Sequence, residues 1–130
     1  MSRSAPSMDE WLKEAKADES APNCGMYLFH NGVVRQTAKA AVREGKSDTA
    51  EVKGMIFRYD AKKVEAARLN TLVMPGIEYV HVWLNEGELK VGDDIMLVLI
   101  GGDIRPHVVA ALQNLVSELK NNCVSERETY

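Results

Sequence analysis

The sequence is poor in cysteine and histidine, the residues that stabilise many small domains through disulfides or bound metal ions. Only two of its 130 residues are cysteines, Cys24 and Cys123, and they lack the spacing of metal ligands. The three histidines are equally scattered, so neither a metal site nor a cofactor is expected. No segment approaches the roughly 20 apolar residues that span a membrane, and the first residues lack a signal-peptide pattern. We therefore expect a cytoplasmic protein with reduced thiols.

An excess of basic residues is missing as well. Sixteen Lys and Arg residues stand against nineteen Asp and Glu, which gives a formal net charge of -3. That balance argues against an extended nucleic-acid surface, because phosphate backbones attract concentrated positive charge. A Walker loop, a dinucleotide fingerprint and a Ser-His-Asp order are also absent. A site for a small anionic ligand remains possible.

The chain is long and apolar enough for one α+β domain. Apolar residues make up 45% of it, so it can bury a core without disulfides. Residues 1–8 are expected to form a flexible tail and residues 9–130 the domain, with a possible lid loop at 44–51. Hydrophobic periodicity predicts helices at 9–16, 61–74 and 105–120, and strands at 26–35 (bent at Gly32), 52–59, 77–84, 94–100 and near the C-terminus. This order favours a mixed or antiparallel sheet with helices packed on it.

The last helix carries the charged residues of greatest interest. Asp103 is expected to cap it, Val108, Leu112, Leu115 and Leu119 to form its core stripe, and Gly101-Gly102 to let a ligand approach the backbone. Arg105 in its first turn could bind an anion, since free N–H groups and the helix dipole favour negative charge there. A solvated arginine at an ordinary strand-to-helix turn is the alternative.

Lys120 lies at the other end of the same helix, where a cation gains from the dipole, so an ordinary helix-end lysine is the alternative to a functional one. Fifteen residues at about 1.5 Å each separate it from Arg105 by roughly 22 Å. One small ligand cannot contact both within one subunit. If both are functional, a dimer must bring them together. Cys123 could be a nucleophile if a nearby cation stabilised its thiolate, although a buried, inert thiol is commoner.

Two short patterns resemble the large subunit of molybdopterin synthase, the MoaE family. One is Gly32-Val33-Val34-Arg35, which is similar to the family's Gly-x-Val-Arg, and the other is Gly87-Glu88-Leu89 followed by Gly92-Asp93. The order of elements agrees. The resemblance implies an α/β hammerhead fold and a homodimer whose active site borrows residues from the second subunit. It also implies sulfur transfer from the thiocarboxylated Gly-Gly tail of a small ubiquitin-like carrier of MoaD type to cyclic pyranopterin monophosphate, giving molybdopterin.

The resemblance also assigns residues. Lys120 matches the first of two essential lysines, and the second falls on Arg127, or on Glu126 if the register shifts by one residue. Substrate binding is implied for Val33, Val34, Arg35, Ile104, Arg105 and Glu128, with Ile104 replacing a family histidine. Arg35, Arg105, Lys120 and Arg127 would then form a cationic pocket that stabilises developing negative charge. An arginine cannot replace a lysine in proton transfer, since its pKa exceeds about 12.

Two other functions remain open from the sequence. A non-catalytic relative could bind a pterin or a carrier tail without transferring sulfur, because Ile104 and Arg127 differ from the family residues. A dimerisation domain without a ligand is the third possibility. The enzyme, a sulfurtransferase, is the reading that the residues favour most.

Overall fold

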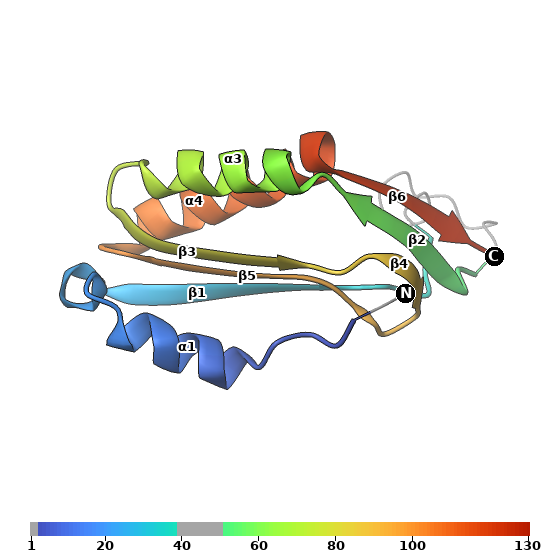
Figure 1. Cartoon of the computed structure of the whole chain (residues 1–130), viewed down its shortest axis with the longest axis horizontal. Coiled ribbons are helices and arrows are strands. Elements are labelled where there is room, and N and C mark those ends of the chain that lie inside the picture. The colour runs from blue at the N-terminus through green and yellow to red at the C-terminus, as the bar shows by residue number, and fades with distance from the viewer. Residues whose placement is uncertain (1–2, 39–50) are drawn as a thin grey trace.

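The computed structural model describes residues 3–38 and 51–130, and Figure 1 shows their arrangement. Sheet A consists of β1 (Met26–Val33), β5 (Asp94–Gly102) and β3 (Ile77–Leu84) in that order, all antiparallel. Helix α1 (Met8–Ala17) covers one face of sheet A, while α3 (Ala61–Leu72) and α4 (Arg105–Glu118) cover the other (Figure 1). The short Ala21–Asn23 turn of 3-10 helix joins α1 to β1. The class is α+β, as the sequence predicts.

A second sheet extends beyond the ends of α3 and α4. Sheet B consists of β4 (Gly87–Lys90), β2 (Gly54–Tyr59) and β6 (Val124–Thr129) in that order, again antiparallel. A π-helical turn, Leu119–Cys123, connects α4 to β6. The sequence predicts a single sheet, and the second one arises because the C-terminal strand pairs with β2 and not with β5. No helix among the described residues is long and apolar enough to cross a membrane.

Strand β5 organises the core because it is the middle strand of sheet A, and both its faces are covered. Successive side chains on a strand point to opposite faces. Leu97 and Leu99 therefore meet α1, where they pack with Trp11 and Ala15. The alternate residues of β5, Met96, Val98 and Ile100, face α3 and α4 and join the larger cluster, which includes Ala67, Val108, Ala111 and Leu115 of these helices. The almost wholly apolar sequence of β5 follows from this double burial.

Several local predictions are confirmed by the structure. The register of β1 shifts between Gly32 and Val33, which is the predicted bend, and the strand ends there. Asp60 caps α3 by accepting hydrogen bonds from the backbone N–H groups of Lys62 and Lys63 at 3.0 and 3.2 Å. The predicted core stripe of α4 is buried at Val108, Leu115 and Leu119, while Leu112 is half-buried.

The bounds of the predicted helices and strands agree with the structure to within two residues, and the main difference lies at residues 87–90. The first helix spans Met8–Ala17, one residue longer at each end than predicted. Residues 87–90 form the short strand β4, where no strand was predicted from the sequence. The predicted loop at 44–51 lies, apart from Glu51, outside the described residues. Within the predicted tail, Arg3 donates from its backbone to Asn85 Oδ1 at 2.8 Å and from its guanidinium to the Leu84 carbonyl. The flexibility of residues 1–8 stays a prediction.

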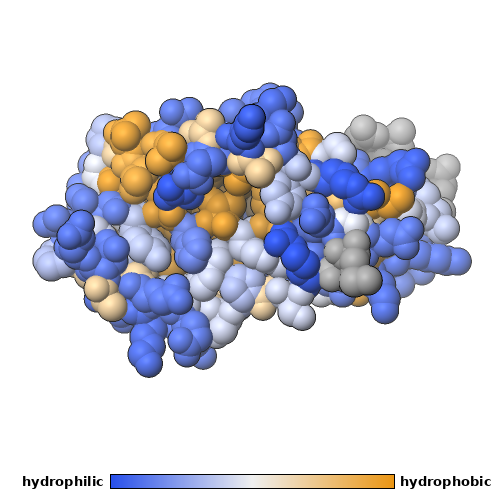
Figure 2. Space-filling model, in the orientation of Figure 1, coloured by the Kyte–Doolittle hydropathy of each residue, from blue (hydrophilic) through white to orange (hydrophobic). Residues whose placement is uncertain are grey.

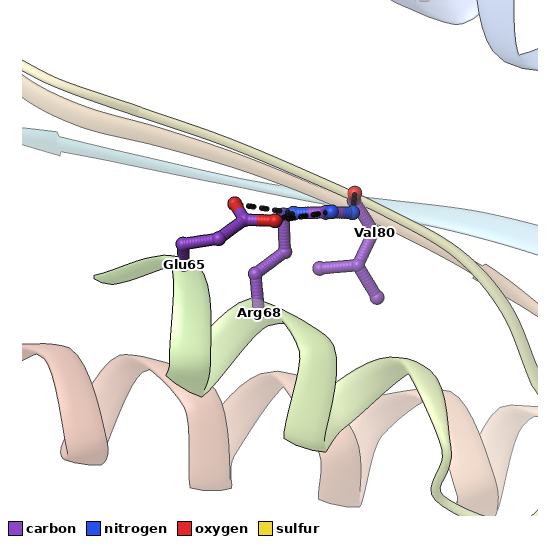
Figure 3. A network of polar contacts seen from close by, with 3 residues as sticks. All are labelled: Glu65, Arg68 and Val80. Atoms are coloured by element: carbon purple, nitrogen blue, oxygen red, sulfur yellow. Dashed lines mark hydrogen bonds and ion pairs between the residues drawn. The ribbon is translucent and has the colours of Figure 1, made fainter. Parts of the chain in front are cut away.

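The outer edge of β3 is occupied by a side chain. Arg68 of α3 donates to the backbone carbonyl of Val80 at 3.3 Å, and the Glu65 carboxylate holds the same guanidinium at 2.6 Å (Figure 3). An unpaired backbone carbonyl on the outer strand of a sheet can accept a hydrogen bond from a strand of another chain. Arg68 satisfies this one from within the chain.

The surface is divided in its polarity. Figure 2 shows apolar side chains gathered on this face over the end of the molecule that holds α3 and α4, whereas the opposite half is mostly hydrophilic. Leu69 and Val73, near the C-terminal end of α3, are 47% and 82% exposed.

Two histidines should make the fold sensitive to acid. His81 stacks on Trp11 with ring centroids 3.7 Å apart, and burial lowers its pKa below the ordinary 6.5. Burial also lowers the pKa of His30, to which the charge of Lys120 contributes. The unfolded chain binds protons at both sites near pH 6.5 while the folded chain does not, so stability should fall as the pH drops below about 6.5.

Thermal unfolding followed by circular dichroism between about pH 7.5 and 5.5 checks this expectation. His81→Phe keeps a ring for stacking on Trp11 and removes the titrating group, so its melting temperature should depend less on pH. A wild-type melting temperature that stays constant or rises on acidification would contradict the prediction.

Candidate active site

A small pocket lies where the end of β1, the π-helical turn and β6 meet. It encloses about 60 Å³, and we call it the Lys120 pocket; its lining residues are Val33, Arg35, Met55, Ile95, Lys120, Glu126 and Glu128. Four of the eight residues selected from the sequence are therefore gathered here from three separate segments: Val33, Arg35, Lys120 and Glu128. Such convergence of distant segments is not expected of unrelated surface charges.

The bulge in β1 brings Arg35 to the pocket. Val34 is buried directly after the bulge, and its backbone is tied to the β4–β5 turn by Val34 N–H donating to Asp93 at 3.0 Å and by Gly92 N–H donating to Val34 at 2.8 Å. Arg35 then leaves the sheet, and its Nε donates to the Thr37 carbonyl at 2.8 Å. Val34 anchors the segment while its neighbours Val33 and Arg35 line the pocket.

Lys120 reaches the pocket because α4 widens at its end. The turn Leu119–Cys123 is π-helical, and it buries Leu119 and Cys123 while Lys120 between them stays exposed. π-helical turns often occur at functional sites, where they redirect side chains. Besides burial, the charge of the Lys120 ammonium lowers the pKa of His30 on β1. Lys120 is therefore close enough to sheet A to interact electrostatically with it.

Strand β6 sends its acidic side chains toward the pocket and its arginine away from it. Glu126 and Glu128 pair with Phe57 and Met55, on the face of sheet B that carries the buried side chains of β2. Arg127 pairs with Ile56 on the other face and is exposed. The one-residue shift considered from the sequence therefore describes this geometry: Glu126, and not Arg127, faces Lys120.

Ile104 and Arg105 lie at the opposite end of α4. Ile104 is the N-cap, is 53% exposed and offers no capping side chain. Asp103, which was expected to be the cap, stands one residue earlier, and its Oδ1 accepts the Ile104 N–H at 2.6 Å and contacts His107 Nδ1 at 2.8 Å. The contact with His107 lowers the pKa of Asp103. A carboxylate thus already occupies this helix start, where Arg105 was expected to bind an anion.

The two glycines before α4 are explained by packing. A Cβ on Gly101 would lie 2.6 Å from the Tyr27 ring, and one on Gly102 would lie 2.6 Å from the Gly76 carbonyl oxygen and 2.7 Å from Val108. Both residues are buried. Their lack of a side chain lets neighbouring parts of the protein approach, and the prediction that they admit a ligand was wrong.

Cys123 does not have the environment of a nucleophile. Its side chain is 3% exposed, and burial, with Glu118 as the next contribution, raises the pKa of its thiol. Reactive cysteines need the opposite, a stabilised thiolate in partial contact with solvent. Among residues 3–38 and 51–130, no three His, Cys, Asp or Glu side chains gather as metal ligands.

The predicted cluster of four cations is therefore only half assembled in one subunit. Arg35 and Lys120 share a pocket with two glutamates, whereas Arg127 lies on the outer face of sheet B and Arg105 at the far end of α4. The arrangement can hold a small anionic group between two cations and can accept hydrogen bonds through two carboxylates.

Comparisons with known proteins agree with this fold. The structure matches the molybdopterin synthase of Staphylococcus aureus with a TM-score of 0.72 at 15% identity, covering 98% of this chain and 88% of the other. It matches the molybdopterin cofactor biosynthesis protein E of Burkholderia multivorans with a TM-score of 0.73 at 17% identity, covering 98% and 80%. No curated protein sequence matches the chain.

A third solved structure is a protein-protein complex of subunits 1 and 2 of the molybdopterin-converting factor of Helicobacter pylori. It is similar with a TM-score of 0.66 at 18% identity, covering 97% of this chain and 80% of the other. At these identities the structures show a shared fold, while the sequence itself matches the MoaE protein family over residues 3–122. That match spans nearly the whole domain, and the chain belongs to the MoaE family, the large subunits of molybdopterin synthase.

Proposed function

We propose that this chain is catalytically active and transfers sulfur from a thiocarboxylated carrier of MoaD type to cyclic pyranopterin monophosphate, in the cytoplasm. The observation that carries the proposal is the convergence of Arg35 and Lys120 in one small pocket. Arg35 supplies a fixed charge and directional donors for an anionic group of a substrate. Lys120 supplies an ammonium that can give and regain a proton near a developing negative charge.

The position of Arg105 is accounted for by a homodimer. Arg105, Val109, Leu112 and Val116 recur at helical spacing along one side of α4, and Lys120 follows four residues later. The three apolar residues between the charges are half-buried. The midpoint between positions 105 and 120 falls at Leu112 and Gln113. A two-fold axis through that midpoint would place Arg105 of a second copy beside Lys120 of the first.

A hollow exists at the required place. It encloses about 450 Å³ and is lined by His30, Leu112, Gln113, Val116 and Ser117. The Nε2 atom of His30 is buried and lacks a hydrogen-bond partner among the described residues. Buried polar atoms without partners are costly, so a second copy that covered the hollow and offered a polar group would stabilise it.

The dimer is tested by sedimentation equilibrium on the full chain at micromolar concentration, where we expect a dimeric mass. Val116→Glu places a charge in the apolar stripe and should give a monomer that makes little product. Asn114→Glu introduces the same charge on the opposite, exposed side of α4 and should remain dimeric. A monomeric wild type would contradict a shared site.

Activity itself is tested by incubating the chain with a thiocarboxylated carrier and cyclic pyranopterin monophosphate, and following molybdopterin formation. The alternative is a non-catalytic relative that binds the precursor or the carrier tail. It is favoured by Ile104 and Glu126, neither of which can act as the histidine or the lysine that the family resemblance implies. Precursor binding in calorimetry without product formation would support that alternative.

A further inference from the structure

His30 lies at the centre of the surface through which two copies would join. It lines the hollow of about 450 Å³ beside α4 together with Leu112 and Gln113, the residues through which the two-fold axis would run. A two-fold axis places each atom near it close to the same atom of the second copy. The two His30 rings, one from each copy, would therefore meet in the same closed hollow.

The walls of this hollow are uncharged. On β1 the neighbours of His30 on the same face are Leu28 and Gly32, and its partner on β5 is Val98. The other residues of α4 that line the hollow are Leu112, Gln113, Val116 and Ser117. The carboxylates of α1 lie beyond the opposite face of sheet A (Figure 1). None of these side chains offers His30 a negative charge.

The charged groups nearer to His30 oppose a further positive charge. Burial, and after it the charge of Lys120, lowers the pKa of His30. Glu118, which follows the hollow on α4, accepts a hydrogen bond from Asn122 at 2.9 Å. The second copy would add its Arg105 beside Lys120. Protonation of both His30 rings would thus place two more positive charges in a covered region that is already cationic.

We infer that His30 makes the association of two copies pH-dependent: the copies join while the ring is neutral and separate when it is protonated. The neutral ring suits a covered interface, because its buried and unpartnered Nε2 atom can share a hydrogen bond with Gln113 of the second copy. The protonated ring instead faces a second imidazolium without the water that would stabilise it. This switch rests on the proposed homodimer, and it turns off any site that the two copies share.

Acid should favour the separate copies. The dimer buries both rings further, so two separate copies bind protons at His30 more readily than the dimer does. The stability of the dimer is therefore complete above the pKa of His30 in the separate copy, which lies below 6.5, and is lost as the pH falls through that value. Because two protons are taken up, the dissociation constant can rise by up to about 100-fold per pH unit in that range.

The experiment is sedimentation equilibrium of the full chain at several concentrations and constant ionic strength. Wild type should be dimeric at about pH 7.5, and its dissociation constant should rise at least about tenfold by about pH 5.5. His30→Phe keeps a ring and removes the titrating group, so its dissociation constant should change less than about twofold over the same range. Circular dichroism of the same samples distinguishes dissociation from unfolding, since the separated copies should keep the helix and strand signal.

His81→Phe is the matched control. Burial also lowers the pKa of His81, but this ring stacks on Trp11 on the other face of sheet A, away from α4. Its removal should leave the pH dependence of association unchanged. In the synthase assay, His30→Phe should keep its activity at about pH 6, where wild type loses activity by dissociation.

A wild-type dissociation constant that does not respond to pH, or a His30→Phe variant that responds as wild type does, would overturn the switch. A monomeric wild type at about pH 7.5 would reject the homodimer and the switch together. The catalytic proposal fails separately, because a pH-dependent dimer that forms no molybdopterin at any pH would reject sulfur transfer and leave the switch standing.

Discussion

Lys120→Ala should lower the rate of molybdopterin formation by about 10²- to 10⁴-fold, the range for removal of a positioned proton donor or acceptor. Among the described residues that line the pocket, Lys120 is the only lysine, and Arg35, the other cation, cannot exchange a proton near neutral pH. Its side chain is exposed, so little packing is lost on truncation. Single-turnover product formation with excess thiocarboxylated carrier measures the effect.

The loss must be separated from a change in folding. A lysine near a helix end contributes only about a few tenths of a kcal/mol, so the melting temperature of Lys120→Ala should stay close to that of wild type. Lys16→Ala is the matched control, because Lys16 is an exposed lysine in the last turn of α1. It should leave both turnover and stability unchanged. Unaltered turnover in Lys120→Ala would show that this lysine is only a helix-end cation.

Phe57→Ala should destabilise the fold by about 3–5 kcal/mol, the usual cost of removing a fully buried ring. Phe57 is 0% exposed and lies on β2, the middle strand of sheet B, while its cluster joins side chains from both sheets and from α3 and α4. Its ring is thus part of the contact that fixes sheet B against the rest of the domain. Chemical denaturation gives the free energy of unfolding directly.

The neighbouring strand position provides the comparison. Ile56→Ala removes a half-buried side chain from the outer face of the same strand, so it should cost clearly less than Phe57→Ala. Phe57→Ala should also weaken any ligand binding in the Lys120 pocket, since Glu126 pairs directly with Phe57. Equal destabilisation by the two variants would mean that sheet B is not held through its inner face.

Two predictions that depend on local physics, those for β5 and for the start of α3, are confirmed. The unbroken apolar run of β5 has no favourable place except the middle of a sheet covered on both sides. Asp60 caps α3 because a carboxylate can reach the free N–H groups of the first turn whatever surrounds the helix. Such features need only a few neighbouring residues and are readable from sequence.

The sequence did not show which side chains of β6 point toward the core. Alternation shows that Glu126 and Arg127 point in opposite directions, but only the pairing with β2 decides which of them faces the core. Residues 125–128, Ser-Glu-Arg-Glu, are all polar, so hydrophobicity does not indicate which face of the strand is buried. The assignment of Arg127 to the pocket rested on a family spacing, and the structure places Glu126 there, along with the expected Arg35, Lys120 and Glu128.

The π-helical turn and strand β4 were missed for related reasons. Residues 119–123 read as the end of an ordinary α-helix, because widening by one residue leaves no mark in hydrophobic spacing. β4 alternates buried Gly87 and Leu89 with exposed Glu88 and Lys90, a pattern too short to outweigh its turn-forming neighbours. Tertiary pairing with β2 makes it a strand.

The contact of Arg68 with the β3 edge bears on how many copies can join. Sheet A has two outer strands, and on β3 a backbone carbonyl is already bound by Arg68, whereas β1 pairs only with β5 among the described residues. A chain able to associate at both margins could add copies without end and form filaments. The homodimer proposed above forms through α4 and not through a sheet margin, so binding of the β3 carbonyl by Arg68 removes one route by which further copies could add. Arg68→Ala should therefore lower the concentration at which the protein begins to aggregate. It should not alter the Lys120 pocket, because none of the described residues that line it belongs to α3 or β3.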